Sequence, residues 1–547
     1  MKPTTNRRDF MMRSIQSLGA IGLSQGTIAS LMGAIYSRAL ATEAQKLKLN
    51  EKGFRYVFVN LYGAPPRWMF DMPPTPMGSS PSNYVSGGFG NSFEISGQTI
   101  QLQNRTFTYN YGSGKSLFLP PVWGMSPTGL DFTSILPHAL FVRGIDMEIN
   151  SHPVSNARQV APISGGHSLH GVVADQMGSP IAAVVTTLPS GAAFKSAKGL
   201  GSTPANPSGN PIDAIIAPFR NMPNSIPFRQ ELAKPVVTQF LDRIDRYAKI
   251  NKMPGSTLRN ALDSADQLIR LNIDSLAALW PGLLNKYTDI VNRGIRPSKG
   301  ELPGVYDKII PCVSGDLRLR FRIQDSNLMD HSDARDMIQS DSTHAQMSRQ
   351  FALTEFLLTT GMSSCVDLAA GTNVLDKALV RTGLSVPIIA DQHGVGAVTS
   401  IVATTLYYRA LLGSLTELVS SLKSQQLFDK TVLHISSEFN RNPRVDGSGS
   451  DHGVRGGNST IISGMFDEVS YIGNIQKNGF SGSPGTWGLA ADWTFEDGTR
   501  RPIKVNDIAR TITGMTNSAE IVANGYSLVR PAANGKWTPK TSGGENV

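Results

Sequence analysis

Arg55-Tyr56-Val57-Phe58-Val59-Asn60-Leu61-Tyr62 is a run of β-branched and aromatic residues that ends at Gly63 and Pro65-Pro66. Such a run, bounded by turn residues, predicts a buried strand, and we expect it to be the first strand of the core. Runs of the same kind predict further strands at 139–145, 182–187, 365–368, 431–435 and 458–462.

Helical periodicity appears between these runs. It predicts helices at 346–360, 399–423 and 505–515, the last with Asn506 or Asp507 as its N-cap. Strands that alternate with long helices predict an α/β fold whose sheet is mostly parallel. The segment 72–128 is rich in Pro, Gly, Ser and Asn, which indicates loops and short strands.

A second helical region lies at 228–293 and carries an apolar stripe on each side of Pro254-Gly255. Together with the polar stretch that follows, it predicts a helical insertion at about 228–343 within one large domain. The stripe would also fit a docking partner, although such stripes more often pack into a core.

The composition is that of a globular protein. The chain has 547 residues, of which 40% are hydrophobic and 17% charged, so it contains enough apolar material for a large core. Its formal net charge is +9, but no long basic run concentrates that charge. This distribution argues against nucleic acid as a partner.

The N-terminus has the three parts of an export signal. Arg7-Arg8 precedes Phe10, the stretch 15–37 has no charged residue, and Ala39-Leu40-Ala41 supplies a cleavage site. This order predicts a twin-arginine signal peptide at 1–41, a mature chain at 42–547 and a periplasmic or extracellular location. The twin-arginine export machinery is then a partner.

No later segment is apolar for long enough to span a bilayer, so we expect no transmembrane segment in the mature chain. The two cysteines, Cys312 and Cys365, would meet an oxidising compartment after export, and one disulfide between them is a possibility.

Polar residues gather at three places just beyond predicted strands. These places are Asp391-Gln392-His393-Gly394, the segment that begins at Ser436-Ser437-Glu438, and Asp451-His452-Gly453. In open α/β sheets, functional groups collect at the carboxyl ends of strands. Carboxylates and imidazoles suit Zn, Mn or Mg, so the pattern predicts a divalent metal site. The alternative is a loop ion pair of Glu438 with Arg441 and no metal.

These motifs carry a family resemblance. Ser437-Glu438-Phe439-Asn440-Arg441-Asn442-Pro443, followed by Asp451-His452-Gly453, resembles the S-E-F-G-R-T-P…D-H signature of domain of unknown function 1501. Asp391-Gln392-His393-Gly394 resembles the W-D-T-H-G motif of the same exported bacterial family. That family belongs to the alkaline phosphatase and sulfatase superfamily.

The resemblance implies an alkaline phosphatase-like sandwich with helices on both faces of a mostly parallel central sheet. It also implies a metal site built from Asp391, His393, Glu438, Asp451 and His452. Asn150-Ser151-His152-Pro153 resembles an N-H segment of the family, which implies catalytic roles for His152 and Ser151, with Arg441 stabilising negative charge. Met69 and Phe439 stand where the family and superfamily place further ligands.

Two functions are therefore open. The first is an exported metal-dependent hydrolase that acts on phosphate, sulfate or related esters of a small molecule or polymer. The second is a catalytically inactive relative that serves as a periplasmic or cell-surface binding or assembly protein. Met69, Phe439 and the lack of a clear nucleophile favour the second.

Overall fold

The computed structural model describes seven stretches of the chain: 53–73, 90–205, 279–301, 321–329, 341–370, 397–475 and 490–540. Within them, the residues 96–97, 104–105, 113, 164–165, 178, 180, 187–193, 296, 298–300, 324–326, 444–449, 454–455 and 519–524 are not described. The predicted signal peptide and most of the predicted insertion lie outside these stretches.

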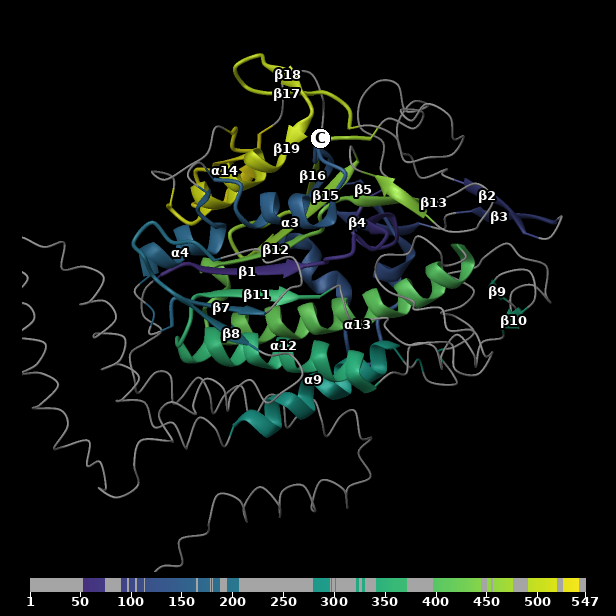
Figure 1. The fold of residues 1–547 in the computed structure, drawn as a ribbon, viewed down its shortest axis with the longest axis horizontal. Helices are drawn as coiled ribbons and strands as arrows, with labels where there is room; N and C mark the ends of the chain where they lie inside the picture. The colour runs from purple at the N-terminus through teal and green to yellow at the C-terminus, as the bar shows by residue number, and fades with distance from the viewer. Residues whose placement is uncertain are drawn as a thin grey trace, which may run out of the picture.

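A nine-stranded sheet forms the centre of the molecule (Figure 1). Its strand order is β16-β6-β15-β12-β1-β11-β7-β8, and β19 pairs with β6 beside this path. The strands are β1 (Arg55–Asn60), β6 (Ala139–Asp146), β7 (Ala183–Thr186), β8 (Ser202–Ala205), β11 (Cys365–Ala369), β12 (Thr431–Ser436), β15 (Gly457–Ser463), β16 (Ser470–Ile472) and β19 (Ile503–Lys504).

The sheet is mostly parallel, as the sequence predicts. The exception is β15, which runs antiparallel to both β12 and β6. Every residue of β1 and β12 is buried, which explains why neither strand shows the strict alternation of apolar and polar residues that a half-exposed strand would have. Asn60 pairs with Ser436 of β12 and with Ala369 of β11, so these three strands end together at one edge of the sheet.

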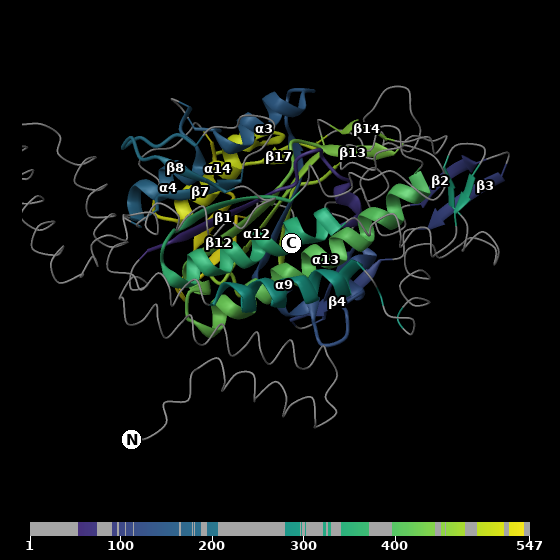
Figure 2. The same cartoon turned by 60° about the horizontal axis from the view of Figure 1, so that its bottom comes forward.

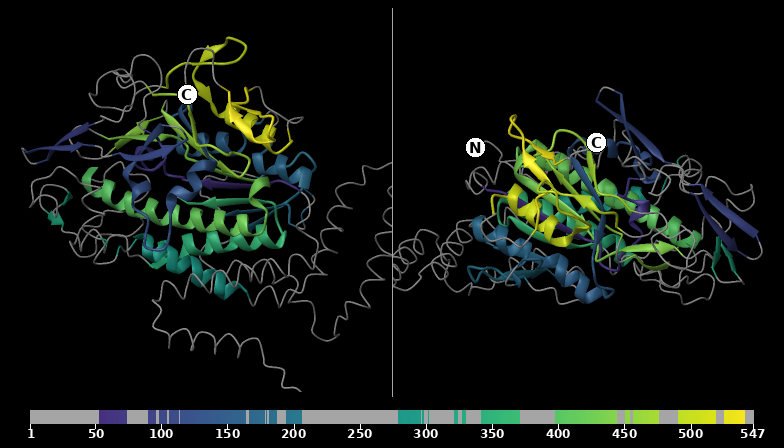
Figure 3. Two further views of the ribbon diagram at one scale, coloured as in Figure 1. Left: turned by 180° about the vertical axis from the view of Figure 1, so that it is seen from behind. Right: turned by 90° about the horizontal axis from the view of Figure 1, so that it is seen from above.

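Helices cover both faces of the sheet (Figures 1 and 2). On one side lie α3 (His152–Val160), α4 (Leu169–Met177) and α14 (Val505–Met515). On the other lie α12 (Asp341–Thr360) and α13 (Ala397–Ser424), and α9 (Trp280–Ile295) packs across both of them. Figure 3 shows the same layers from behind and from above. The fold is therefore mixed α/β with a mostly parallel central sheet.

The predicted helices at 346–360, 399–423 and 505–515 are confirmed. The predicted N-cap of the last helix is wrong. Lys504 is the N-cap residue of α14, and Asp507 lies three residues further on, where its carboxylate accepts the Lys504 backbone N–H at 2.8 Å. An acidic side chain in the first helical turn can satisfy a free N–H group from inside the helix, so sequence alone misplaces the cap.

Short strands and hairpins surround this body. The predicted loops and short strands at 72–128 include β2 (Gly90–Ile95), β3 (Gln98–Gln103), β4 (Phe107–Tyr111) and β5 (Lys115–Leu119). The other small pairs are β9 (Phe321–Ile323) with β10 (Asn327–Met329), β13 (Asn440–Pro443) with β14 (Ser450–Gly453), β17 (Trp493–Thr494) with β18 (Arg500–Arg501), and β20 (Val529–Pro531) with β21 (Trp537–Pro539).

Cys365 has a free thiol, fully buried in β11, and burial raises its pKa. Cys312, the other cysteine of the disulfide considered above, lies outside the described residues. None of the helices that the structure describes is long and apolar enough to cross a membrane.

A buried charge cluster joins α9 to α12 and α13. The Lys286 ammonium lies 2.6 Å from the Glu355 carboxylate and 2.8 Å from that of Glu417, and the Tyr287 hydroxyl also donates to Glu355. The side chains of Lys286 and Glu355 are both buried, at 4% and 0% exposed. This helix layer therefore depends on charge compensation as well as on apolar packing.

We predict that Lys286→Met destabilises the protein by about 3–5 kcal/mol, because it removes the buried cation that is paired with the Glu355 carboxylate. Arg500→Met is the matched control, since Arg500 pairs with Asp492 at the surface, where a lost pair costs at most about 1 kcal/mol. Urea unfolding of both variants measures the difference. Equal losses of unfolding free energy in the two variants would contradict the prediction.

A second buried polar group is the imidazole of His434, in the centre of β12. Its Nδ1 lies 2.9 Å from the Tyr56 hydroxyl and its Nε2 lies 2.8 Å from the Ser459 hydroxyl. Burial, followed by repulsion from the Arg67 and His170 side chains, lowers the pKa of His434 to about 3. The ring is therefore neutral in the folded protein under ordinary conditions.

His434 makes stability depend on pH. Below about pH 6.5 the unfolded chain protonates this ring and the folded protein does not, so the free energy of unfolding falls as the pH drops from 6.5 toward 3. The loss approaches about 1.4 kcal/mol per pH unit. In His434→Gln this part of the slope disappears. Unfolding titrations at several pH values compare the slopes, and identical slopes for both proteins would exclude the effect.

Candidate functional site

The candidate site lies where β1 and β12 end. The chain leaves β1 through Gly63 and Ala64 and enters a short 3₁₀ helix, η1 (Arg67–Met69). It leaves β12 through Ser437 and Glu438 and enters β13. Because the two strands are parallel neighbours in register, both loops meet at the same edge of the sheet.

Glu438 is the central acidic residue of this edge, and its side chain is fully buried. Its Oε1 accepts the Gly63 backbone N–H at 2.6 Å and lies 2.6 Å from Nδ1 of His152. A carboxylate can only accept hydrogen bonds, so Nδ1 carries the proton and the imidazole is oriented by Glu438. The second oxygen, Oε2, is buried and has no hydrogen-bond partner among the residues that the structure describes.

His152 is the first residue of α3, and Ser151 is the N-cap. The imidazole lies among aromatic rings, with centroids 4.6 Å from Phe439 and 4.7 Å from His452. Its side chain is 16% exposed, whereas that of Glu438 is completely enclosed. Of the two side chains, that of His152 is therefore the one in contact with solvent.

Arg441 supplies a buried positive charge beside the dyad. Its Nε donates to the Ala64 carbonyl at 3.1 Å, and one terminal nitrogen donates to the Gly63 carbonyl at 3.0 Å. The same terminal nitrogen lies 3.3 Å from Nε2 of His152. Since Nδ1 carries the proton, Nε2 is the acceptor of this bond. Glu438, His152 and Arg441 thus form one connected chain of acceptor and donor groups.

The turn after β1 is strained to meet these partners. Gly63 and Ala64 both have positive φ, 99° and 51°, and Ala64 is fully buried. A residue with a Cβ in this left-handed region costs on the order of 1 kcal/mol. The turn presents one N–H to Glu438 and two carbonyls to Arg441, and this set of bonds holds it in place.

A second buried ion pair occupies the neighbouring loop. Arg67 donates hydrogen bonds to both carboxylate oxygens of Asp71, and the Thr460 hydroxyl donates to the same carboxylate at 2.7 Å. Arg67 also donates to the Ser437 hydroxyl at 3.2 Å. Both oxygens of Asp71 are therefore engaged in contacts that hold the loop in place.

The structure brings together four of the predicted site residues: His152, Glu438, Arg441 and His452. Nδ1 of His452 is hydrogen-bonded to the Asn150 amide oxygen, which fixes its ring against Phe439. Asp451 is exposed on β14. Ser151 makes no capping hydrogen bond through its hydroxyl. Asp391 and His393 lie outside the described residues.

Sequence reasoning missed the role of Asn440. The residue looks like a simple departure from Gly in the signature, but its side-chain oxygen accepts the backbone N–H groups of both Arg67 and Arg441. It joins the two loops at a buried position. The available signal was the residue type, because an amide accepts hydrogen bonds from backbone groups that Gly would leave unpaired.

The fit of this site to a metal ion can be judged from its donor atoms. The buried Oε2 of Glu438 is a suitable ligand oxygen, whereas Nε2 of His152 is occupied by Arg441. Among the residues that the structure describes, no three His, Cys, Asp or Glu side chains form a group that could hold a metal ion. Glu438 Oε2 is therefore a candidate ligand oxygen, and the described residues do not complete a site around it.

In comparisons with known proteins, no family model, no curated protein and no solved structure matches the chain.

Proposed function

We propose that this protein hydrolyses phosphate, sulfate or related esters at the edge where β1 and β12 end. The observation that carries the proposal is the connected chain Glu438–His152–Arg441, in which an oriented imidazole lies between a buried carboxylate and a buried guanidinium. A carboxylate that orients an imidazole is a common arrangement for general acid–base catalysis.

Each group has a distinct role in the proposed reaction. Glu438 fixes the tautomer and orientation of His152, so that Nε2 is the basic atom. Nε2 takes a proton from the attacking water or hydroxyl and returns it to the leaving oxygen. Arg441 binds the anionic oxygens of the ester and stabilises the charge that develops on them.

A divalent cation belongs to the proposal as an expectation from the motifs. Glu438 through Oε2 would be one of its ligands, and Asp391, His393, Asp451 and His452 are the other proposed ligands. When bound, Zn, Mn or Mg would polarise the ester oxygen.

The family resemblance supports a finer version of the same proposal. An alkaline phosphatase-like sandwich would place its site at this edge of a mostly parallel sheet, and a mostly parallel sheet is what supports this version. The twin-arginine motif supports a periplasmic or extracellular location for the proposed activity. Detection of the mature chain beginning near residue 42 in a periplasmic fraction would test this part.

One observation favours the alternative, a noncatalytic binding or assembly protein. In this structure Arg441 is bonded to His152 and to two backbone carbonyls, and Asp71 is bonded to Arg67, so the charges of the edge compensate one another. A His393→Ala, His452→Ala double variant separates the two functions. Partner binding that survives the change favours the alternative, whereas loss of hydrolysis with the fold retained favours the enzyme.

We predict that His152→Asn lowers kcat on aryl phosphates or sulfates by about 10²–10⁴, because Asn retains a donor for Glu438 but lacks the base at Nε2. His138→Asn is the matched control. His138 precedes β6 at the opposite edge of the sheet and binds the Phe466 carbonyl through Nδ1. Equal kcat in the His152 variant and the wild type would sink the assignment.

We also predict that the mature protein, purified without chelator, contains a divalent metal and that Glu438→Gln lowers its occupancy. The change replaces the buried ligand oxygen with a neutral amide, which binds divalent cations more weakly. Glu468→Gln, at an exposed carboxylate, is the control. Elemental analysis measures the occupancy. Full occupancy in both variants, or none in the wild type, contradicts the metal part of the proposal.

A further inference from the structure

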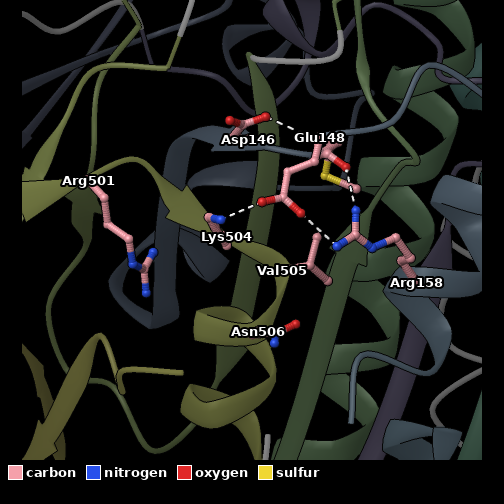
Figure 4. A pocket seen from close by; sticks show the side chains of 8 residues that line it. Asp146, Glu148, Arg158, Arg501, Lys504, Val505 and Asn506 are labelled. Carbon is pink, nitrogen blue, oxygen red and sulfur yellow. Dashed lines mark hydrogen bonds and ion pairs between the residues drawn. The ribbon is translucent and has the colours of Figure 1, made fainter. Parts of the chain in front are cut away.

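A cavity of about 260 Å³ with several charged residues in its lining opens at the same edge of the sheet, beyond the carboxyl end of β6 (Figure 4). Its lining comes from the end of β6 and the turn that follows it, from α3, from β18 and β19, and from the first turn of α14. The charged residues of the lining are Asp146, Glu148, Arg158, Arg501 and Lys504. None of them takes part in the Glu438–His152–Arg441 chain.

The cations of this cavity are held in two different ways. Arg501 is fixed, because both of its terminal nitrogens donate to the buried carboxylate of Asp507 at 2.8 Å. Arg158 and Lys504 instead converge on Glu148, as Figure 4 shows. Arg158 lies 2.6 Å from Oε2 of Glu148, and Lys504 binds Oε1.

Glu148 occupies the position that an external anion would take. It is the one acidic side chain that binds both Arg158 and Lys504 in the described residues, and these hydrogen bonds lower its pKa. About two fifths of each cationic side chain is exposed, at 41% for both, and Glu148 is 34% exposed. Exposed ion pairs contribute little net stability, so a competing anion can displace this carboxylate at small cost.

The volume of the cavity indicates a ligand larger than a single small ion. A water molecule in the liquid takes about 30 Å³, so the space holds several times the volume of one water. Val505 and Asn506 add the start of an eleven-residue helix to the lining, where the helix dipole also favours negative charge. The shape and charge together suit an anionic group attached to a larger polar molecule.

We propose that this cavity is an anion-binding site in which Arg158 and Lys504 hold a phosphate, sulfate or carboxylate group, and in which Glu148 takes the place of that group when the site is empty. The ligand exchanges with the Glu148 carboxylate, which turns toward solvent. No bond is made or broken in this exchange. The inference does not rest on hydrolysis at His152, because it concerns binding alone.

Isothermal titration of the full mature chain with inorganic phosphate tests the proposal at constant ionic strength. Glu148→Gln keeps the length of the side chain but removes the competing charge, so phosphate should bind at least about tenfold more tightly than to the wild type. Adding Arg158→Gln and Lys504→Gln to this variant should abolish the gain. Glu468→Gln, which removes an exposed carboxylate paired with Lys115, is the control for the change in net charge.

A second variant at the same position shows whether the result with Glu148→Gln comes from misfolding. Glu148 has a φ of 62°, a conformation that Asn adopts more readily, so Glu148→Asn removes the carboxylate at a backbone position that suits the new residue. It should show the same gain in affinity. If neither variant binds phosphate more tightly than Glu468→Gln does, the proposal is wrong.

A second probe, glucose 6-phosphate, distinguishes a free anion from an anionic group that is part of a larger molecule. If the natural ligand is a larger molecule, this sugar phosphate binds more tightly than inorganic phosphate and the difference persists in Glu148→Gln. Equal affinities for the two probes, both strengthened by the variant, assign the site to a free anion. His152→Asn should leave either affinity unchanged, and loss of binding in that variant would place the anion at the other site and overturn the proposal.

Discussion

Two buried charges at the end of the sheet determine the geometry around them. Glu438 and Arg441 follow the same strand, and the fold removes both from water. A buried charge is tolerated only when hydrogen bonds and an opposite charge compensate it. The turn after β1 provides this compensation, because Gly63 gives its N–H to the carboxylate and its carbonyl to the guanidinium. The backbone of this turn adopts positive φ angles in the conformation that makes both hydrogen bonds.

The buried pair of Arg67 and Asp71 extends the same constraint to a third strand. Asn458 and Thr460 of β15 donate to Asp71, while Arg67 donates to the Ile435 carbonyl at the end of β12. One ion pair therefore ties the loop after β1 to both β12 and β15. Arg67 also donates to the Ser437 hydroxyl, so the same pair contacts the residue directly before Glu438.

The sequence predicts the parts of this arrangement that depend on local composition. The apolar runs at 55–62 and 431–435 indicate strands, and polar residues directly after them indicate a functional edge. The antiparallel direction of β15 was not predictable, because a fully buried strand has the same composition in either direction. The pairing of Arg67 with Asp71 also escaped prediction, since both residues lie in a Pro-rich segment that carries no helical pattern.

The hydrogen bond between Arg441 and His152 gives the proposed hydrolase a way to couple substrate binding to basicity. While Arg441 donates to Nε2, the lone pair of the imidazole is occupied and the ring is a poor base. An ester oxyanion is a stronger acceptor for a guanidinium than a neutral imidazole nitrogen is. An anionic substrate that attracts Arg441 therefore releases Nε2 at the moment when a proton acceptor is needed, and a neutral ester would not. The same contact thus favours anionic esters over neutral ones without any further residue.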